Sequence, residues 1–247
     1  MYFPGKEIQK RYVLVERLGF SEKSHVFLAR DLILGKNRII KLLTKENFSE
    51  AMFYQKLEHP LLPQIFDLVE EKEAVFLVLQ YIPGQTLDQL FQKNGSLPEK
   101  WLIAFSLRLC SVMEYLHSQN PPVLHGDIKP SNLLLSSFGQ PFLIDLGSAV
   151  QGVSKRKRLF GTRGFAPPEQ YQGHLFPCSD IYALGKTLAC LGGASLSADF
   201  LTLIHDCCLP EPSLRIPDFF ALHKRLREFC PDLDSYFLPC PASSNML

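Results

Sequence analysis

A change of pattern at Tyr81-Ile82-Pro83-Gly84 constrains the fold of this 247-residue chain more than any other feature. Before it, apolar and β-branched runs of strand length predict strands at residues 11–18, 26–29, 38–43 and 74–80. One helix is predicted among them, at residues 48–57, and a hairpin turn at Lys36-Asn37, after Gly35. We therefore expect a small antiparallel sheet that carries one helix.

After this boundary the pattern becomes helical. Helices are predicted at residues 86–92, 178–190, 198–208 and 218–230. A capping box at Ser96-Leu97-Pro98-Glu99, with proline in the first turn, is expected to open a long helix that runs to about His117. The predicted fold class is α+β, with a β-rich lobe and a helical lobe in one domain, 1–247. Its parts are a lobe at about 11–80, a hinge at about 80–84, a lobe at about 85–236 and a tail at 237–247. A cleft between such lobes is a usual ligand site.

Composition excludes several classes of function. The net charge of +1 gives no whole-molecule field for nucleic acid or membrane, so neither is expected as a partner. The seven cysteines form no C-x-x-C pair, which favours a reducing compartment. No signal peptide and no apolar run of about 18 residues is visible. We therefore expect a cytoplasmic protein without a membrane span.

Three segments carry the residue types that phosphoryl transfer requires, which are carboxylates, amide oxygens and lysines for positioning and charge neutralisation. The first is His125-Gly126-Asp127-Ile128-Lys129-Pro130-Ser131-Asn132, and the second is Phe142-Leu143-Ile144-Asp145-Leu146-Gly147. The third is Gly161-Thr162-Arg163-Gly164-Phe165-Ala166-Pro167-Pro168-Glu169. A polar turn could account for each segment by itself. It does not account for Asp127, Lys129 and Asn132 at these offsets, followed in order by the other two segments.

This ordered set resembles the protein kinase family, in its eukaryotic-like (Hanks-type) serine/threonine form, and is similar to compact bacterial members. The resemblance implies that Asp127 is the base for the substrate hydroxyl and that Lys129 steadies the transferring phosphate. It implies Mg²⁺ ligation by Asn132 and by Asp145, with Mn²⁺ as an alternative ion. Thr162 would contact Asp127 and Lys129.

Other positions match structural parts of the family. Glu169 would pair with Arg215, and the helix that contains Asp180 and Gly185 would anchor the catalytic loop. In the first lobe, Arg38-Ile39-Ile40-Lys41 resembles the V-A-I-K strand, so that Lys41 would contact the α- and β-phosphates of ATP. Glu50 is the best partner for Lys41, with Glu46 as a rival. Because nine residues separate Lys41 from Glu50, the helix must be short.

The nucleotide site is expected from the same resemblance. Its residues would be Leu18, Gly19, Ser21, Val26, Ile39, Lys41, Leu79, Gln80, Tyr81, Ile82 and Leu134. In the phosphate loop Ser21 and Ser24 replace two glycines, so the backbone should approach phosphate less closely. Ile39 stands where alanine is usual and should narrow the adenine pocket.

The resemblance implies an enzyme that transfers the γ-phosphate of ATP to Ser or Thr hydroxyls of a protein substrate. The alternative is a kinase-like scaffold with weak or no catalysis, favoured by the serines of the phosphate loop, by Ile39 and by a short second lobe. A small-molecule kinase also uses a His-Gly-Asp sequence, but Lys129 and Thr162 argue against it. Gly126 replaces the arginine that reads a loop phosphate in regulated members, so activation-loop phosphorylation should not be required.

A basic run, Lys155-Arg156-Lys157-Arg158, follows Ser154. Such a run is most often a solvated loop. The functional reading is that it binds an acidic partner or substrate, or a phosphate on Ser154. The sequence assigns no particular protein substrate and no oligomeric state.

Overall fold

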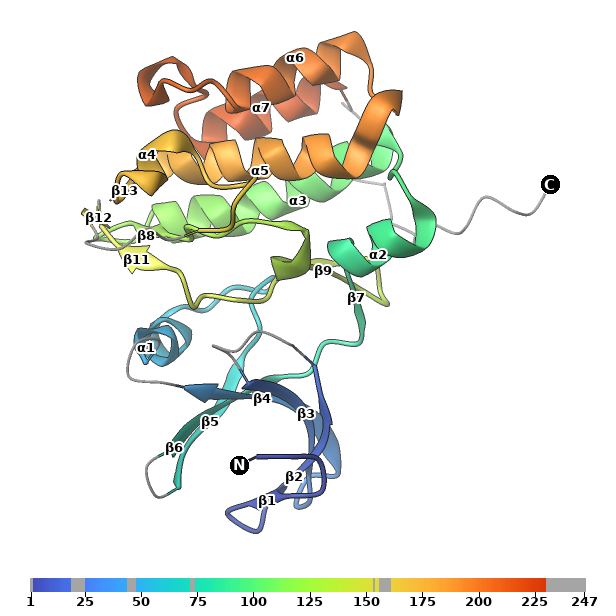
Figure 1. Cartoon of the computed structure of the whole chain (residues 1–247), viewed down its shortest axis with the longest axis vertical. Coiled ribbons are helices and arrows are strands. Elements are labelled where there is room, and N and C mark those ends of the chain that lie inside the picture. Colours follow the sequence, from blue (N-terminus) through green and yellow to red (C-terminus); the bar gives the residue numbers. More distant parts are fainter. Residues whose placement is uncertain are drawn as a thin grey trace, which may run out of the picture. The chain divides into compact units, whose positions relative to one another are not determined.

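The computed structural model describes residues 2–18, 25–43, 48–71, 74–152, 154–155 and 161–229. The chain divides into two compact units, Met1–Pro83 and Gly84–Leu247 (Figure 1). Gly19, Ser21 and Glu46 lie outside the described residues, as do residues 156–158 of the basic run and the tail at 237–247.

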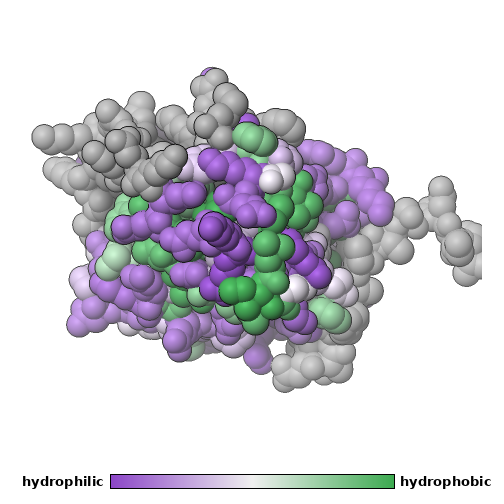
Figure 2. All heavy atoms as spheres, turned by 90° about the horizontal axis from the view of Figure 1, so that it is seen from below, coloured by the Kyte–Doolittle hydropathy of each residue, from purple (hydrophilic) through white to green (hydrophobic). Residues whose placement is uncertain are grey.

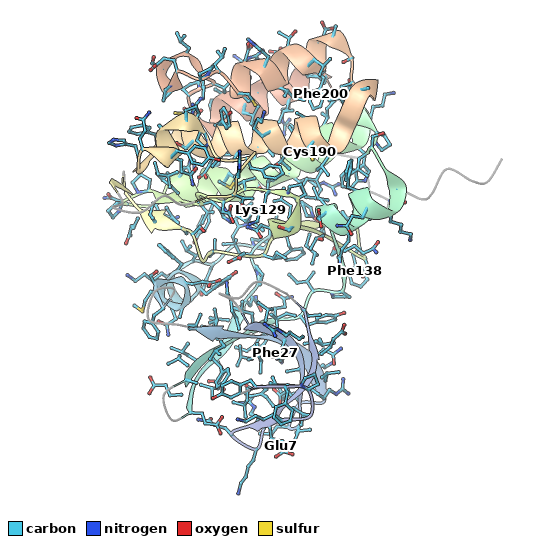
Figure 3. The ribbon with its side chains drawn as sticks, viewed as in Figure 1. Glu7, Phe27, Lys129, Phe138, Cys190 and Phe200 are labelled. Atoms are coloured by element: carbon cyan, nitrogen blue, oxygen red, sulfur yellow. The ribbon has the colours of Figure 1, made fainter. Side chains whose placement is uncertain are left out.

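In the first unit, six described strands form one antiparallel sheet in the order β1-β2-β3-β4-β6-β5. They are β1 (Glu7–Ile8), β2 (Tyr12–Arg17), β3 (His25–Asp31), β4 (Lys36–Leu43), β5 (Ile65–Glu71) and β6 (Ala74–Gln80). The sheet curls around an apolar core, and Phe27 is labelled within that curl (Figure 3). The buried side chains of this core are Ile8, Tyr12, Leu14, Phe27, Ala29, Ile40, Val69, Phe76 and Val78.

The β3–β4 turn corrects the sequence prediction. The turn occupies residues 32–35, and Lys36 and Asn37 already belong to β4. The reason is Asp31, whose Oδ1 accepts hydrogen bonds from the backbone N–H groups of Ile33 (3.0 Å) and Leu34 (3.2 Å). A short acidic side chain that bonds to the backbone two residues later starts a turn. The turn exposes three consecutive aliphatic side chains, Leu32, Ile33 and Leu34. On the face seen from below, hydrophobic side chains are interleaved with hydrophilic ones (Figure 2).

Among the described residues of this unit the one helix is α1 (Ser49–Lys56), with Glu50 in its first turn. At eight residues it is short, as its distance from Lys41 requires. Strand β5 was not predicted, because only Val69 among its side chains is buried and three carboxylates interrupt the apolar pattern. Its place at the edge of the sheet explains why so polar a segment can still form a strand.

In the second unit helices dominate (Figure 1). They are α2 (Leu87–Asn94), α3 (Glu99–His117), α4 (Pro168–Tyr171), α5 (Pro177–Gly192), α6 (Ala198–Cys207) and α7 (Phe219–Phe229). Helix α3 packs against α5 and α7, and α5 packs against α6. Most side chains of α3 are buried, so it forms the centre of this unit. Within the described ranges, no helix is both long and apolar enough to cross a membrane.

Short strands connect these helices. They are β7 (Gly84–Thr86), β8 (Val123–Leu124), β9 (Leu133–Ser136), β10 (Pro141–Leu143), β11 (Val150–Gln151), β12 (Ser154–Lys155) and β13 (His174–Leu175). Strand β9 pairs with β7 and β10, β8 pairs with β11, and β12 pairs with β13. The β9–β10 pair is the one that positions polar groups of the candidate site.

The expected capping box at Ser96 is wrong. Helix α3 is preceded by Pro98 and receives no side-chain cap. Glu99 instead accepts hydrogen bonds from the backbone N–H (2.5 Å) and the hydroxyl (2.9 Å) of Ser197, the N-cap residue of α6. A capping box forms at Thr86, where Thr86 and Gln89 exchange hydrogen bonds at the start of α2. The capping-box rule assigns the Glu99 carboxylate to the start of its own helix, but this carboxylate bonds to the start of α6 instead.

Candidate functional site

A buried ion pair lies in the first unit. Lys41 Nζ on β4 is 2.8 Å from Oε1 and 2.7 Å from Oε2 of Glu50 on α1. Lys41 is 6% exposed and Glu50 is 1% exposed. A charge at this depth requires a partner, because desolvation otherwise costs several kcal/mol. The pair therefore fixes the ammonium group of Lys41 at one face of the sheet.

That face is shared with the apolar side chains expected around a nucleotide base. Lys41 is the cross-strand neighbour of Val26 on β3 and of Leu77 on β6. Ile39, two residues before Lys41 on the same face, is the cross-strand neighbour of Leu79. The core residue Ile40 points to the opposite face. Strand alternation therefore places a cation and an apolar strip on the same surface.

Of the other expected nucleotide residues that the structure describes, Leu18 and residues 80–82 belong to the first unit and Leu134 belongs to the second. Leu18 is 46% exposed, and its N–H donates to the carbonyl of Val26 (2.8 Å). Gln80 ends β6, and Tyr81 and Ile82 follow it without regular structure. Leu134 lies on β9 of the second unit and is partly buried.

The loop that the sequence predicts to be catalytic, residues 125–132, runs between β8 and β9 and ends in a 3₁₀ turn, Pro130–Asn132. Gly126 has φ +73°, in the left-handed region that favours glycine. The fully buried carboxylate of Asp180 accepts the backbone N–H groups of His125 and Gly126, each at 2.8 Å. His117 Nε2 donates to the same carboxylate at 3.0 Å. Asp180, at the start of α5, therefore holds the loop backbone from α5.

The electrostatics of Asp180 follow from these contacts. Burial on its own raises the pKa of this carboxyl, but hydrogen bonds from His117 and Gly126 and the nearby histidine rings lower it. The net pKa lies below its ordinary value, so Asp180 is an anion that accepts only. Sequence reasoning placed Asp180 here but missed His117, because a histidine at the end of a helix gives no signal of a partner 63 residues away.

Asp127, Lys129 and Thr162 form one hydrogen-bonded cluster. Thr162 Oγ1 donates to Asp127 Oδ1 at 2.6 Å, and Lys129 Nζ donates to Thr162 Oγ1 at 2.7 Å. Lys129 Nζ also lies 2.7 Å from Asp127 Oδ2. The Lys129 side chain remains 23% exposed and that of Asp127 13%, so both groups can be reached from solvent. Figure 3 labels Lys129 in this part of the second unit.

Two side chains with oxygen atoms that could bind a metal ion, those of Asn132 and Asp145, lie beside this cluster. Asn132 Nδ2 donates to the carbonyl (2.9 Å) and to Oδ2 (3.3 Å) of Asp127, which leaves Asn132 Oδ1 as an acceptor. Strands β9 and β10 pair Leu133 with Leu143, and Ile144 N–H donates to the carbonyl of Asn132 (3.0 Å). This ladder brings Asp145 next to Asn132. Asp145 Oδ1 accepts from Gly147 N–H at 2.8 Å, and an amide oxygen and a carboxylate are ligands that suit Mg²⁺.

A second buried ion pair supports the segment after Thr162. Arg215 binds Glu169 through both terminal nitrogens, at 2.6 Å and 2.8 Å, and Ser179 Oγ donates to Glu169 at 2.8 Å. Burial opposes ionisation of Glu169, but these bonds lower its pKa overall. Gln170 Nε2, which sequence reasoning missed, donates to the carbonyl of Gly126 at 2.6 Å. Its glutamine side chain links α4 directly to the catalytic loop.

Comparison with known proteins agrees with this geometry. A family model of the protein kinase domain matches residues 12–199. The chain is 30% identical over 199 residues to serine/threonine-protein kinase PrkC of Bacillus subtilis, covering 74% of this chain and 30% of PrkC. It is 31% identical over 214 residues to serine/threonine-protein kinase C of Synechocystis sp., covering 76% and 40%. It is 27% identical over 201 residues to serine/threonine-protein kinase PknB of Mycobacterium leprae, covering 73% and 32%. The matched regions span between 30% and 40% of the length of these relatives.

Proposed function

This chain belongs to the protein kinase family, and from that premise we propose that it transfers the γ-phosphate of ATP to serine or threonine hydroxyls of a protein. The observation that carries the proposal is the Asp127–Lys129–Thr162 cluster, in which one carboxylate is bonded by a lysine and a threonine hydroxyl. The similar proteins named above are described as serine/threonine kinases, which supports a Ser/Thr acceptor.

The proposed chemistry assigns each polar group one task. ATP with Mg²⁺ supplies the phosphoryl group, whose bond to the β,γ-bridging oxygen breaks as the acceptor oxygen bonds to phosphorus, and ADP leaves. Asp127 orients the acceptor hydroxyl and takes its proton. Lys129 places a positive charge beside the oxygens of the transferring group. Thr162 holds Asp127 and Lys129 in register.

For the metal, Asn132 Oδ1 and the Asp145 carboxylate are the proposed ligands. Both are hard oxygen donors, which suit Mg²⁺ and also accept Mn²⁺. Among the described residues no group of three or more His, Cys, Asp and Glu side chains could hold a metal ion. A site completed by phosphate oxygens, rather than a cage built by protein alone, agrees with that finding.

For the nucleotide, Lys41 is proposed to contact the α- and β-phosphates while Glu50 holds it. Val26, Ile39 and Leu79 would meet one side of adenine, with the backbone of residues 80–82 on its edge. Leu18 and Leu134 would add apolar contacts, and Gly19 and Ser21 would lie at the phosphates.

The proposal is tested by incubating the protein with labelled ATP, Mg²⁺ and a generic acceptor protein, beside the variant Asp127→Asn. We expect labelled acceptor with the wild type and a loss of at least 100-fold in the variant, since a general base contributes about 10²–10⁴-fold. Equal labelling by both proteins would end the proposal.

A kinase-like scaffold remains the second candidate, and the serines at positions 21 and 24 favour it. Thermal-shift titration with ATP and Mg²⁺ separates the two readings, because a ligand that binds the folded state raises the melting temperature. A scaffold that binds no nucleotide should show no shift. One that binds nucleotide without catalysis should show a shift together with no labelling.

We also propose that turnover does not depend on activation-loop phosphorylation, because Gly126 offers no cation to a loop phosphate. Phosphatase-treated and untreated enzyme should then have equal kcat, and a large gap would reject this. An acidic partner at Lys155–Arg158 stays a further proposal, which charge reversal of those four residues tests through partner binding. The five described cysteines are free thiols, which supports a proposed cytoplasmic location.

A further inference from the structure

The segment from Gly161 to Ala166 is pinned directly beside the reacting groups. The carbonyl of Thr162 accepts the backbone N–H groups of Phe165 and Ala166, both at 3.0 Å, so the segment folds into a tight turn. The hydroxyl of Thr162 is at the same time bonded to Asp127 and to Lys129. Gly164 has φ +92°, and a Cβ built there would meet no atom within 4 Å. The turn therefore has one end at the catalytic carboxylate and its tip in open space.

Arg163 occupies that turn and is exposed. No hydrogen bond or ion pair joins its guanidinium group to any residue of the described ranges, whereas Lys129 and Arg215 of the same unit are both paired. Guanidinium stays charged at all physiological pH values and presents a planar fork that fits a carboxylate. An unpaired arginine in a fixed turn is thus available to a ligand.

Arg163 lies close enough to the proposed reacting groups to contact a residue beside the acceptor in a bound substrate. Consecutive Cα atoms are about 3.8 Å apart, so the Cα atom of Arg163 lies about that far from the Cα atom of Thr162, whose hydroxyl bonds to Asp127. In an extended peptide, the Cα atoms of the residues one or two positions from the acceptor lie about 4–7 Å from its Cα atom. A long arginine side chain covers the same range. It would reach a side chain next to the acceptor rather than the acceptor itself.

We propose that Arg163 selects protein substrates that carry Asp or Glu within two positions of the Ser or Thr acceptor. The inference rests on the proposed kinase function and names its substrate class. A carboxylate at that place would accept charge-assisted hydrogen bonds from the guanidinium group. A lysine or arginine there would meet a like charge. The basic run after Ser154, which belongs to the same segment between Asp145 and Glu169, has the same sign.

The test uses three peptides with one serine acceptor that differ only in the flanking residues, which are Asp, Ala or Lys. For the wild type, kcat/KM should fall in the order Asp, Ala, Lys, with about tenfold between the ends. The effect should be mostly in KM, because a contact to a flanking residue is equally strong in the ground state and in the transition state. Arg163→Glu should invert the order. Arg163→Ala should make the three values of kcat/KM nearly equal, and Arg163→Lys should keep their order with smaller differences. The preference should shrink in 0.5 M salt, which screens exposed charges.

Lys224→Glu is the matched control. It replaces an exposed lysine of α7 by glutamate, which reverses a charge as Arg163→Glu does. It should leave the order of the three peptides unchanged. If Arg163→Glu and Arg163→Ala both retain the wild-type order while phosphorylating every peptide, the inference is overturned and the kinase function stands. If the wild type labels no peptide and no generic acceptor, and Asp127→Asn behaves identically, the kinase function fails and the inference fails with it.

Discussion

The hydroxyl of Thr162 donates a 2.6 Å hydrogen bond to Oδ1 of Asp127, although the two residues are 35 positions apart in the chain. The same oxygen accepts from Lys129 Nζ at 2.7 Å, so a single neutral side chain bridges an anion and a cation. Because Asp127 and Lys129 also contact each other at 2.7 Å, the three groups form a closed triangle. A closed triangle resists rotation of any one side chain, which is the property a catalytic carboxylate requires.

Replacing Thr162 by valine keeps the shape of the side chain and removes both hydrogen bonds. We expect kcat to fall about 10- to 100-fold, since bonds to charged groups contribute about 1.5–3 kcal/mol. Thr162→Ser keeps the hydroxyl and should retain most activity. Steady-state kinetics and thermal melts of both variants check this, and a valine variant with wild-type kcat would contradict it.

The Lys41–Glu50 pair should behave as a buried charge pair. Glu50→Gln leaves the ammonium of Lys41 without its counter-charge, and we expect a loss of about 3–5 kcal/mol in the free energy of unfolding. The double variant Lys41→Met with Glu50→Leu should recover part of that stability, because it removes both charges. Urea unfolding of Lys41→Met, of Glu50→Leu and of the double variant measures the coupling. Additive losses would show that the pair does not stabilise the unit.

Gly161 and Gly164 offer a comparison within one turn. Both have positive φ, +93° and +92°, so alanine at either costs about 1–2 kcal/mol of backbone strain. A Cβ at Gly161 would also lie 2.5 Å from Gln170 Nε2 and 2.9 Å from Ala166 Cβ, whereas a Cβ at Gly164 meets nothing within 4 Å.

Gly161→Ala should therefore displace the Gln170 side chain, which donates to the catalytic loop at Gly126. We expect a larger loss of both stability and kcat than in Gly164→Ala, measured by melting temperature and turnover. Equal effects of the two substitutions would show that Gln170 gives way without consequence.

Asp180→Asn should destabilise the catalytic loop in a pH-dependent way. The amide nitrogen of asparagine would face a backbone N–H in place of an acceptor, at an expected cost of about 2–4 kcal/mol at pH 7. The pKa of Asp180 is lowered in the folded state. Its contribution to stability is therefore fully present above the unfolded value of about 3.9 and is lost as pH falls through the folded pKa.

The difference in the free energy of unfolding between wild type and Asp180→Asn should accordingly narrow as the pH falls below about 4. Urea unfolding of both proteins across this range provides the measurement. Glu169 also has a lowered pKa, but it is present in both proteins and cancels in the difference. A gap that does not narrow below about pH 4 would contradict the assigned role.

Several parts of the fold followed from short-range pattern. Strand β6 has the predicted bounds, and Glu50 lies in the first turn of a short α1, as its distance from Lys41 indicated. Local rules failed where a tertiary partner competed for the same group. The carboxylate of Glu99 binds Ser197 rather than its own helix start. The β3–β4 turn was misplaced for a local reason instead, because Asp31 starts the turn earlier in the chain by accepting from residues 33 and 34.

The sequence by itself determined which chemical groups this protein has and in what order, because Asp127, Lys129 and Asn132 lie within one short loop. The loop motif carries its own spacing, and backbone geometry fixes that locally. Only the tertiary structure decided what those groups touch. The bonds of Thr162 to Lys129, of Gln170 to Gly126 and of His117 to Asp180 join positions 33, 44 and 63 residues apart. No local periodicity encodes a hydrogen bond over that separation, and only the first of the three was expected, from the family resemblance. That the guanidinium group of Arg163 has no partner among the described residues is likewise a tertiary fact, which no pattern in the sequence indicates.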